Sequence, residues 1–168
     1  MKADLYASSV GVYTRGLATA ERVLEKTEAH AKATGMSEEA MLESRLAADM
    51  FPLRRQIMTV CDFAKQVPSR LLGLPLPAQI TGDLSLAELR AEIAKAKDFL
   101  AGLKPEQFEG RDEAPVTFSI GQDITLPAAQ YALGFGLMNF TFHMSMAYAI
   151  ARHLGADIGK RDLFAGGL

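Results

Sequence analysis

The sequence predicts an all-α protein: a bundle of four main helices with one short extra helix and one small β-hairpin. Three observations support this prediction. Apolar residues recur every three or four positions in several long segments, which is the period of a buried helix face. Glycine, proline and serine separate these segments at positions typical of helix ends. Residues 115–127 instead alternate with the two-residue period of a strand.

The first long helix is predicted from one continuous apolar stripe, made by Tyr6, Val10, Tyr13, Leu17, Ala20, Leu24 and Ala31. Gly35 is placed to end this helix, because glycine readily adopts the left-handed conformation of a C-terminal cap. Ser37 then has the position of a new N-cap. We therefore expect a short helix from Glu38 to Ala48.

The second main helix is predicted to begin at Pro52, since proline is tolerated only in the first turn. Its core face is the stripe Leu53, Ile57, Val60, Ala64, Val67 and Leu71. Pro68 lies inside this stripe, which predicts a kink or break near Val67. Asp62 lies on the opposite side of the helix, which predicts contact with solvent or an interface. Residues 73–83, GLPLPAQITGD, are typical of a loop.

The third main helix has the clearest signal. Ser85 and Glu88 have the spacing of a capping box, and an apolar face follows, made by Leu86, Leu89, Ile93, Ala96 and Leu100. The β-hairpin is predicted next, with its turn at residues 121–123 and alternating apolar residues on either side, namely Val116, Phe118, Ile120, Ile124 and Leu126. Pro127 is expected to start the last helix and Gly155 to end it. The remaining tail is predicted to be irregular.

Length and charge restrict the function. The 168 residues fit a single domain, and the formal net charge is −2 without a strongly basic segment, which argues against nucleic-acid binding. Cys61 is the single cysteine, so the chain can form neither an internal disulfide nor a cysteine zinc cluster. The N-terminus lacks the continuous apolar region of a secretory signal. We therefore expect a cytoplasmic protein.

The segment from Ile124 to Ala151 carries no formally charged residue when His143 is neutral. A membrane span needs about 20 apolar residues, so length alone would allow one. However, the segment begins within the predicted hairpin, includes Pro127, and contains several polar residues, namely Gln130, Asn139, Thr141, His143 and Ser145. A central helix of a bundle explains this composition better, so no membrane association is predicted.

His143 and Asn139 are four residues apart and therefore neighbours on one face of the predicted last helix. They are the strongly polar members of an otherwise small and apolar face. A buried histidine and asparagine both need hydrogen-bond partners or a ligand. Two interpretations remain open. His143 is either a hydrogen-bonded core residue, or a metal ligand or general base in a pocket between helices.

The end of the last helix, HMSMAYAIARHLG, resembles a motif of the DinB/YfiT-like superfamily, in which a histidine precedes an arginine by nine residues and a glycine by twelve. Here these are His143, Arg152 and Gly155. The segments RLAADMFPLRRQ and GKRDLF resemble a bacterial branch of that superfamily, domain of unknown function 1993. The resemblance implies an up-and-down four-helix bundle, often dimeric, and the hairpin predicted from the alternating residues would then lie between the third and fourth helices. It also implies a divalent metal, such as zinc or nickel, held by three histidines.

The histidine triad is incomplete in this sequence. His143 matches the second histidine of the last-helix pair, and Asn139 replaces the first. The second main helix contains no histidine, and its polar candidates are Gln56 and Asp49. Amide oxygens are poor ligands for zinc or nickel. Asp49 also has the simpler interpretation of an N-cap, or of a carboxylate that pairs with Arg45.

Two functions follow from the resemblance and the incomplete triad. The first is a small-ligand-binding or non-catalytic dimeric protein with a degenerate metal site. The second is a divalent-metal-dependent enzyme of the thiol transferase or isomerase type, with a pocket at His143 and Asn139. A homodimer is expected because the side of the last helix away from His143 is too apolar for a solvated face; this side comprises Met138, Thr141, Met144, Ser145 and Tyr148.

Overall fold

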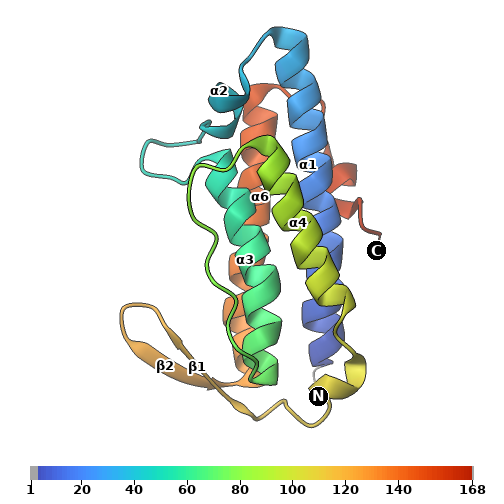
Figure 1. Cartoon of the computed structure of the whole chain (residues 1–168), viewed down its shortest axis with the longest axis vertical. Helices are drawn as coiled ribbons and strands as arrows, with labels where there is room; N and C mark the ends of the chain where they lie inside the picture. The colour runs from blue at the N-terminus through green and yellow to red at the C-terminus, as the bar shows by residue number, and fades with distance from the viewer. Residues whose placement is uncertain (1–3, 168) are drawn as a thin grey trace.

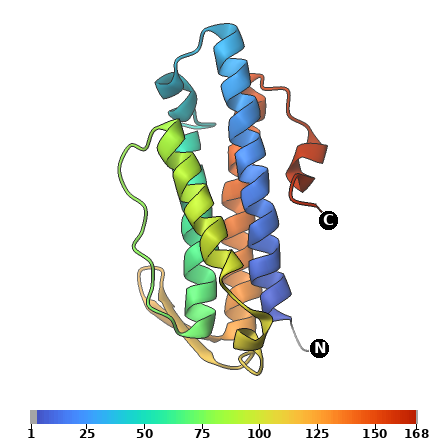
Figure 2. The ribbon, with the colours of Figure 1, turned by 45° about the vertical axis from the view of Figure 1, so that its right-hand side comes forward.

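Four long helices form an up-and-down bundle in the computed structural model, which describes residues 4–167 (Figure 1). They are α1 (Val12–Thr34), α3 (Leu53–Leu72), α4 (Leu86–Ala101) and α6 (Leu137–Leu154). Helix α6 lies between α1 and α3, and α4 packs on the other side of the same pair (Figures 1 and 2). The fold class predicted from the sequence is confirmed.

The helix ends follow the predicted caps. Ser37 accepts a hydrogen bond from the Ala40 backbone N–H and starts the short helix α2 (Glu38–Leu42). Ser85 and Glu88 form the predicted capping box. Gly35 ends α1 in the left-handed conformation. Helix α2 is shorter than the predicted Glu38–Ala48, because the chain leaves it at the C-cap Glu43 and forms an exposed loop.

The β-hairpin lies between α4 and α6, at one end of the bundle (Figure 1). Strands β1 (Pro115–Ser119) and β2 (Asp123–Pro127) pair antiparallel, and Ser119 faces Asp123. Ile120 was expected on a strand, but it lies in the turn with an exposed side chain. The 3-10 helix η2 (Pro105–Phe108) precedes the hairpin.

The break that Pro68 predicts near Val67 does not occur, because α3 continues to Leu72. Pro68 has no backbone N–H to donate to the Ala64 carbonyl. However, Val67 and Leu71 are fully buried, and their packing keeps the helical turns before and after Pro68 in the core. The Ser69 hydroxyl also donates to the Lys65 carbonyl at 2.8 Å. Tertiary packing therefore maintains the helix against the local effect of proline.

Two helical segments are wider than an α-helix. The π-helix η1 (Ala7–Gly11) leads into α1, and the short helix α5 (Ala128–Gln130) continues through the π-helix η3 (Tyr131–Gly136) into α6. The last helix thus begins just after Pro127, as predicted. The tail was expected to be irregular, but it contains the 3-10 helix η4 (Lys160–Phe164). This helix packs on α1, where the Leu163 carbonyl accepts from the Thr19 hydroxyl at 2.8 Å.

The core fills the space between the four long helices. Its largest fully buried side chains include Tyr13 and Leu17 of α1, Leu53 and Ile57 of α3, and Leu89 of α4. Within residues 4–167, none of the helices combines the length and the apolar character that crossing a membrane requires.

Candidate functional site

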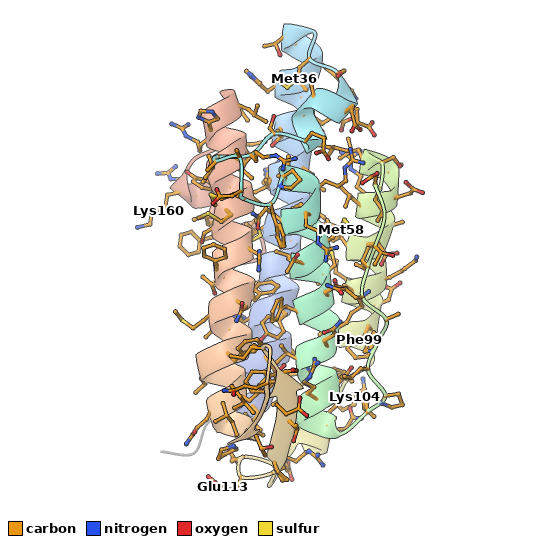
Figure 3. All side chains as sticks on the ribbon, turned by 90° about the vertical axis from the view of Figure 1, so that its left-hand side faces the viewer. Met36, Met58, Phe99, Lys104, Glu113 and Lys160 are labelled. Carbon is orange, nitrogen blue, oxygen red and sulfur yellow. The ribbon has the colours of Figure 1, made fainter. Side chains whose placement is uncertain are left out.

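The imidazole of His143 meets the side chain of Gln56 between α6 and α3. Nδ1 of His143 lies 2.8 Å from Oε1 of Gln56. His143 is half-buried and Gln56 is buried. The two residues come from helices that pack side by side along the face seen in Figure 3. The structure therefore brings together two of the four site residues selected from the sequence.

The Gln56 amide determines the tautomer of His143. Its Nε2 donates to the Phe51 carbonyl at 3.1 Å, so its Oε1 is the atom that faces the imidazole. An amide oxygen only accepts, and the imidazole nitrogen opposite it must therefore carry a proton. In the neutral ring, Nδ1 is then the donor and Nε2 keeps its lone pair. His143 is consequently an oriented hydrogen-bond acceptor at Nε2.

Three phenyl rings surround this imidazole. Phe51 and Phe63 each stack on it with ring centroids 6.1 Å away, and Phe142 meets it edge-on at 5.2 Å. Phe51 and Phe142 remain about half exposed, at 47% and 52%. We call His143, Gln56, Phe51, Phe63 and Phe142 the His143 site. Its polar centre therefore lies within an apolar surface that solvent can reach.

The surroundings keep His143 neutral. Burial lowers the pKa of His143 because the charged imidazolium is poorly solvated, and the Arg55 guanidinium lowers it further. Arg55 lies over the Phe51 ring, with its guanidinium carbon 5.7 Å from the ring centroid. At neutral pH the ring is therefore uncharged, as a hydrogen-bond acceptor at Nε2 requires.

Asn139 and Asp49 do not join this contact. The Asn139 amide donates to the Phe135 carbonyl of its own helix at 2.8 Å, instead of bonding to His143. Asp49 is exposed in the loop before α3, whose N-cap position belongs to Pro52. The predicted N-cap role of Asp49 is therefore wrong, and its predicted partner Arg45 pairs with Glu43 at 2.8 Å.

The donor atoms near His143 do not fit the three-histidine metal site that the family resemblance implies. Both ends of the Gln56 amide are engaged, by Phe51 and by His143. His30 lies beside Gly155 at the far end of α6, and His153 is exposed there. Across residues 4–167, no three His, Cys, Asp or Glu side chains converge in a way that could hold a metal ion. His143 Nε2 alone is a weak basis for zinc or nickel.

Cys61 and Asp62 are both buried, whereas the sequence predicts contact with solvent or an interface for Asp62. Burial raises the pKa of the Cys61 thiol to about 12, which makes it a poor nucleophile. Asp62 is covered by the connecting segment 73–85, whose Ile80 backbone reaches its carboxylate. Both of its carboxylate oxygens accept from the Ile80 backbone N–H, at 3.0 and 3.3 Å.

The aromatic members of the site were missed in the sequence. Phe51 precedes Pro52 in the loop, and Phe63 lies outside the apolar stripe of α3, so neither carries a helical signal. Phe142 does not stand out in the sequence, because the predicted last helix is apolar on all sides. A usable signal exists in hindsight: Phe63 lies seven residues after Gln56, close to two helical turns, and therefore on nearly the same face.

The outward side of α6 is partly covered within the chain. Met144 is 6% exposed and lines a groove with η4, whereas Met138 is 65% exposed. The large exposed apolar side chains of α6 are therefore Met138 and Phe142, which are four residues apart, and Phe142 also contacts His143. This exposed surface is smaller than the predicted face and lies closer to the His143 site.

Comparison with known proteins agrees with this fold. The family described as a domain of unknown function (DUF1993) matches residues 5–164. The structure is similar to the crystal structure of a DinB family member from Shewanella denitrificans, with a TM-score of 0.86 and 32% sequence identity. That similarity covers 95% of this chain and 91% of the other. A comparison with curated proteins gives no significant match. The chain therefore belongs to the DUF1993 family and has a DinB-like helical fold.

Proposed function

We propose that this protein is a non-catalytic, dimeric binder of a small uncharged molecule, and that the ligand is held at the His143 site. The observation that carries this proposal is the chain of contacts from the Phe51 carbonyl through Gln56 to His143, which leaves Nε2 as an oriented acceptor. The ligand needs one N–H or O–H donor to bind this atom.

The phenyl rings suggest the rest of the ligand. Phe51 and Phe142 present apolar surface on two sides of the imidazole, and a flat apolar ring would bury that surface. Arg55 lies over Phe51 and donates to the Ile80 carbonyl at 2.8 Å. The guanidinium disfavours a cationic ligand nearby, so an uncharged aromatic molecule with a hydroxyl or amino group fits best.

A dimer would cover the remaining apolar surface. Met138 and Phe142 form an exposed apolar strip on α6 that continues into the His143 site. A second copy related by a two-fold axis is the commonest way to bury such a strip. In this arrangement the partner subunit also closes one side of the ligand site.

The alternative is a divalent-metal enzyme of the thiol transferase or isomerase type. The free Nε2 lone pair favours it, since zinc and nickel bind neutral imidazole. The engaged amides of Gln56 and Asn139 argue against it. Elemental analysis of protein purified without an affinity tag or chelator separates the two functions. We expect no stoichiometric zinc or nickel, and about one ion per chain, lost in His143→Ala, would support the enzyme instead.

Ligand binding is tested with phenol as the probe and toluene as its counterpart without a hydroxyl. Titration followed through the backbone amide NMR signals of Gln56 and Phe142 should show phenol binding roughly two- to tenfold tighter than toluene. His143→Phe keeps an aromatic ring but removes the acceptor, so this difference should vanish. His153→Phe, an exposed position on the same helix, is the matched control. Equal binding of both probes to the unaltered protein would contradict the proposal.

A further inference from the structure

A surface groove lies between α1, α6 and the C-terminal η4, on the side of α6 away from α3. Its volume is about 330 Å³, close to the lower end of the range for small-molecule sites. Its apolar lining comes from α1, α6 and the tail, namely Val12, Phe140, Met144, Leu163 and Phe164. His143 faces α3 instead, so this groove is separate from the His143 site.

The floor of the groove depends on a close approach of two helices. Phe140 packs so tightly on Gly16 that a Cβ at this glycine would lie 2.3 Å from its ring. Phe140 also packs on Tyr13, with ring centroids 4.6 Å apart. Phe140 and Met144 are buried. The floor is therefore a closely packed apolar surface.

The C-terminal segment forms the outer wall. The Leu163 carbonyl accepts from the Thr19 hydroxyl, and Asp162 pairs with Lys26 at 2.8 Å. Farther along, Gly166 contacts the Arg15 backbone so closely that a Cβ there would lie 2.5 Å from the Arg15 Cα atom. The wall is thus attached to α1 on both sides of Phe164, whose side chain is 47% exposed.

Arg15 supplies a positive charge to this apolar groove. It is exposed, and within residues 4–167 no carboxylate forms an ion pair with it. By contrast, Arg22 on the next turns of α1 pairs with Glu25 at 2.9 Å. Thr141 and Ser145 add exposed hydroxyls from α6. An apolar groove with a guanidinium that pairs with no carboxylate of residues 4–167 complements a molecule with an apolar chain and an anionic head.

We propose that this groove binds a small amphiphilic carboxylate, with its chain on Phe140, Met144 and Phe164 and its carboxylate at Arg15. The probe is sodium octanoate, and 1-octanol is the uncharged counterpart. Binding is followed through the backbone amide signals of Val12, Gly16 and Leu163 in NMR titrations of the full chain. We expect saturable shifts of these three signals with octanoate.

Matched variants separate charge recognition from general adhesion. Arg15→Gln should weaken octanoate binding by at least about tenfold and leave octanol binding unchanged, because only the charged hydrogen bonds are lost. Arg161 lies on η4 outside the lining of the groove, so Arg161→Gln should change the binding of neither octanoate nor octanol. Ser145→Phe fills the groove from an exposed position and should abolish binding of both probes.

At about 10 mM octanoate, a Kd tighter than about 1 mM would give nearly saturated shifts. The absence of saturable shifts at Val12, Gly16 and Leu163 up to this concentration would overturn the inference. Equal octanoate affinity of Arg15→Gln and the unaltered protein would also overturn it. Circular dichroism confirms that each variant is folded. Because the groove and the His143 site are on different sides of α6, the phenol titration and the octanoate titration succeed or fail independently.

Discussion

His143 Nδ1 lies 2.8 Å from Gln56 Oε1, and this contact joins the last helix of the bundle to α3. Because the other end of the Gln56 amide donates to the Phe51 carbonyl, the contact also determines that Nδ1 of the neutral imidazole carries the proton and that Nε2 does not. The proposed ligand binding depends on that arrangement.

The neutral state of His143 predicts a pH dependence of stability. Its pKa is lowered in the folded protein, by burial first and by Arg55 second, whereas the unfolded value is about 6.5. As the pH falls below about 6.5, the unfolded chain therefore binds a proton that the folded chain does not. The free energy of unfolding should decrease from about pH 6.5 down to the folded pKa, and His143 should have no effect above this range.

Urea unfolding between about pH 5 and 7.5 measures this dependence. His143→Asn keeps a donor toward Gln56 but does not titrate, so its stability should decline less over the same range. Parallel curves for the two proteins would show that His143 is not held neutral. In Arg55→Gln, the NMR titration of His143 should move to higher pH, because one of the two causes of the lowered pKa is removed.

Asp62 predicts a second stability effect, at the connecting segment 73–85. Asp62→Ala removes the acceptor of the Ile80 backbone N–H and should cost about 1–3 kcal/mol in the free energy of unfolding. Asp62→Asn keeps an acceptor oxygen and removes a charge whose burial is unfavourable, as the raised pKa of Asp62 indicates. At pH 7 it should be clearly more stable than Asp62→Ala. Equal losses in both variants would contradict the proposed role of the Ile80 contact.

Two nearby glycines of η3 should respond differently to alanine. A Cβ at Gly136 would lie 2.9 Å from the Val67 Cγ1 atom and 3.0 Å from the Tyr13 hydroxyl. Gly136→Ala should therefore destabilise the protein by about 1–3 kcal/mol through overpacking. Apart from its chain neighbours and the backbone of its own helix, no atom of residues 4–167 lies within 4 Å of a Cβ at Gly134. Alanine favours helix, so Gly134→Ala should be neutral or stabilising. Thermal unfolding of both variants distinguishes the positions, and a similar loss at Gly134 would contradict this account of the packing.

The proposed dimer predicts that charge on the α6 strip weakens association. Met138→Glu and Phe142→Glu place a carboxylate at exposed apolar positions and should shift the protein toward monomer in sedimentation velocity. Leu76→Glu, at an equally exposed apolar residue in segment 73–85, should leave the dimer intact. Met144→Glu is unsuitable because Met144 is buried within the chain. A monomer at tens of micromolar for the unaltered protein would contradict the proposal.

Local signals predicted most of the fold. The capping box at Ser85, the cap at Ser37 and the alternating residues of the hairpin each depend on residues a few positions apart. Such local features can be predicted from the sequence alone. Pro68 and the tail were predicted less well. Their structure depends on the burial of Val67 and Leu71, and on the contact of Leu163 with Thr19, which join distant segments.

The candidate site was predicted only in part, because some of its contacts also join segments that are distant in sequence. The helical period of the last helix predicts His143, and the family resemblance implies Gln56 as a polar candidate on the second main helix, where the third ligand would lie. Phe51 could not be selected, because its position depends on the loop that follows α2. The engagement of the Gln56 amide by the Phe51 carbonyl likewise depends on that loop, and it changes Gln56 from a possible ligand into a residue that orients His143.

The tautomer of His143 tests the central claim most directly. A long-range 15N correlation spectrum at about pH 7.5, above the unfolded pKa of histidine, identifies which ring nitrogen carries the proton. We predict a neutral ring protonated at Nδ1 and bare at Nε2, and we predict that Gln56→Leu, which removes the amide oxygen, loses this preference. A ring protonated at Nε2 in the unaltered protein, or at both nitrogens at this pH, would contradict the account.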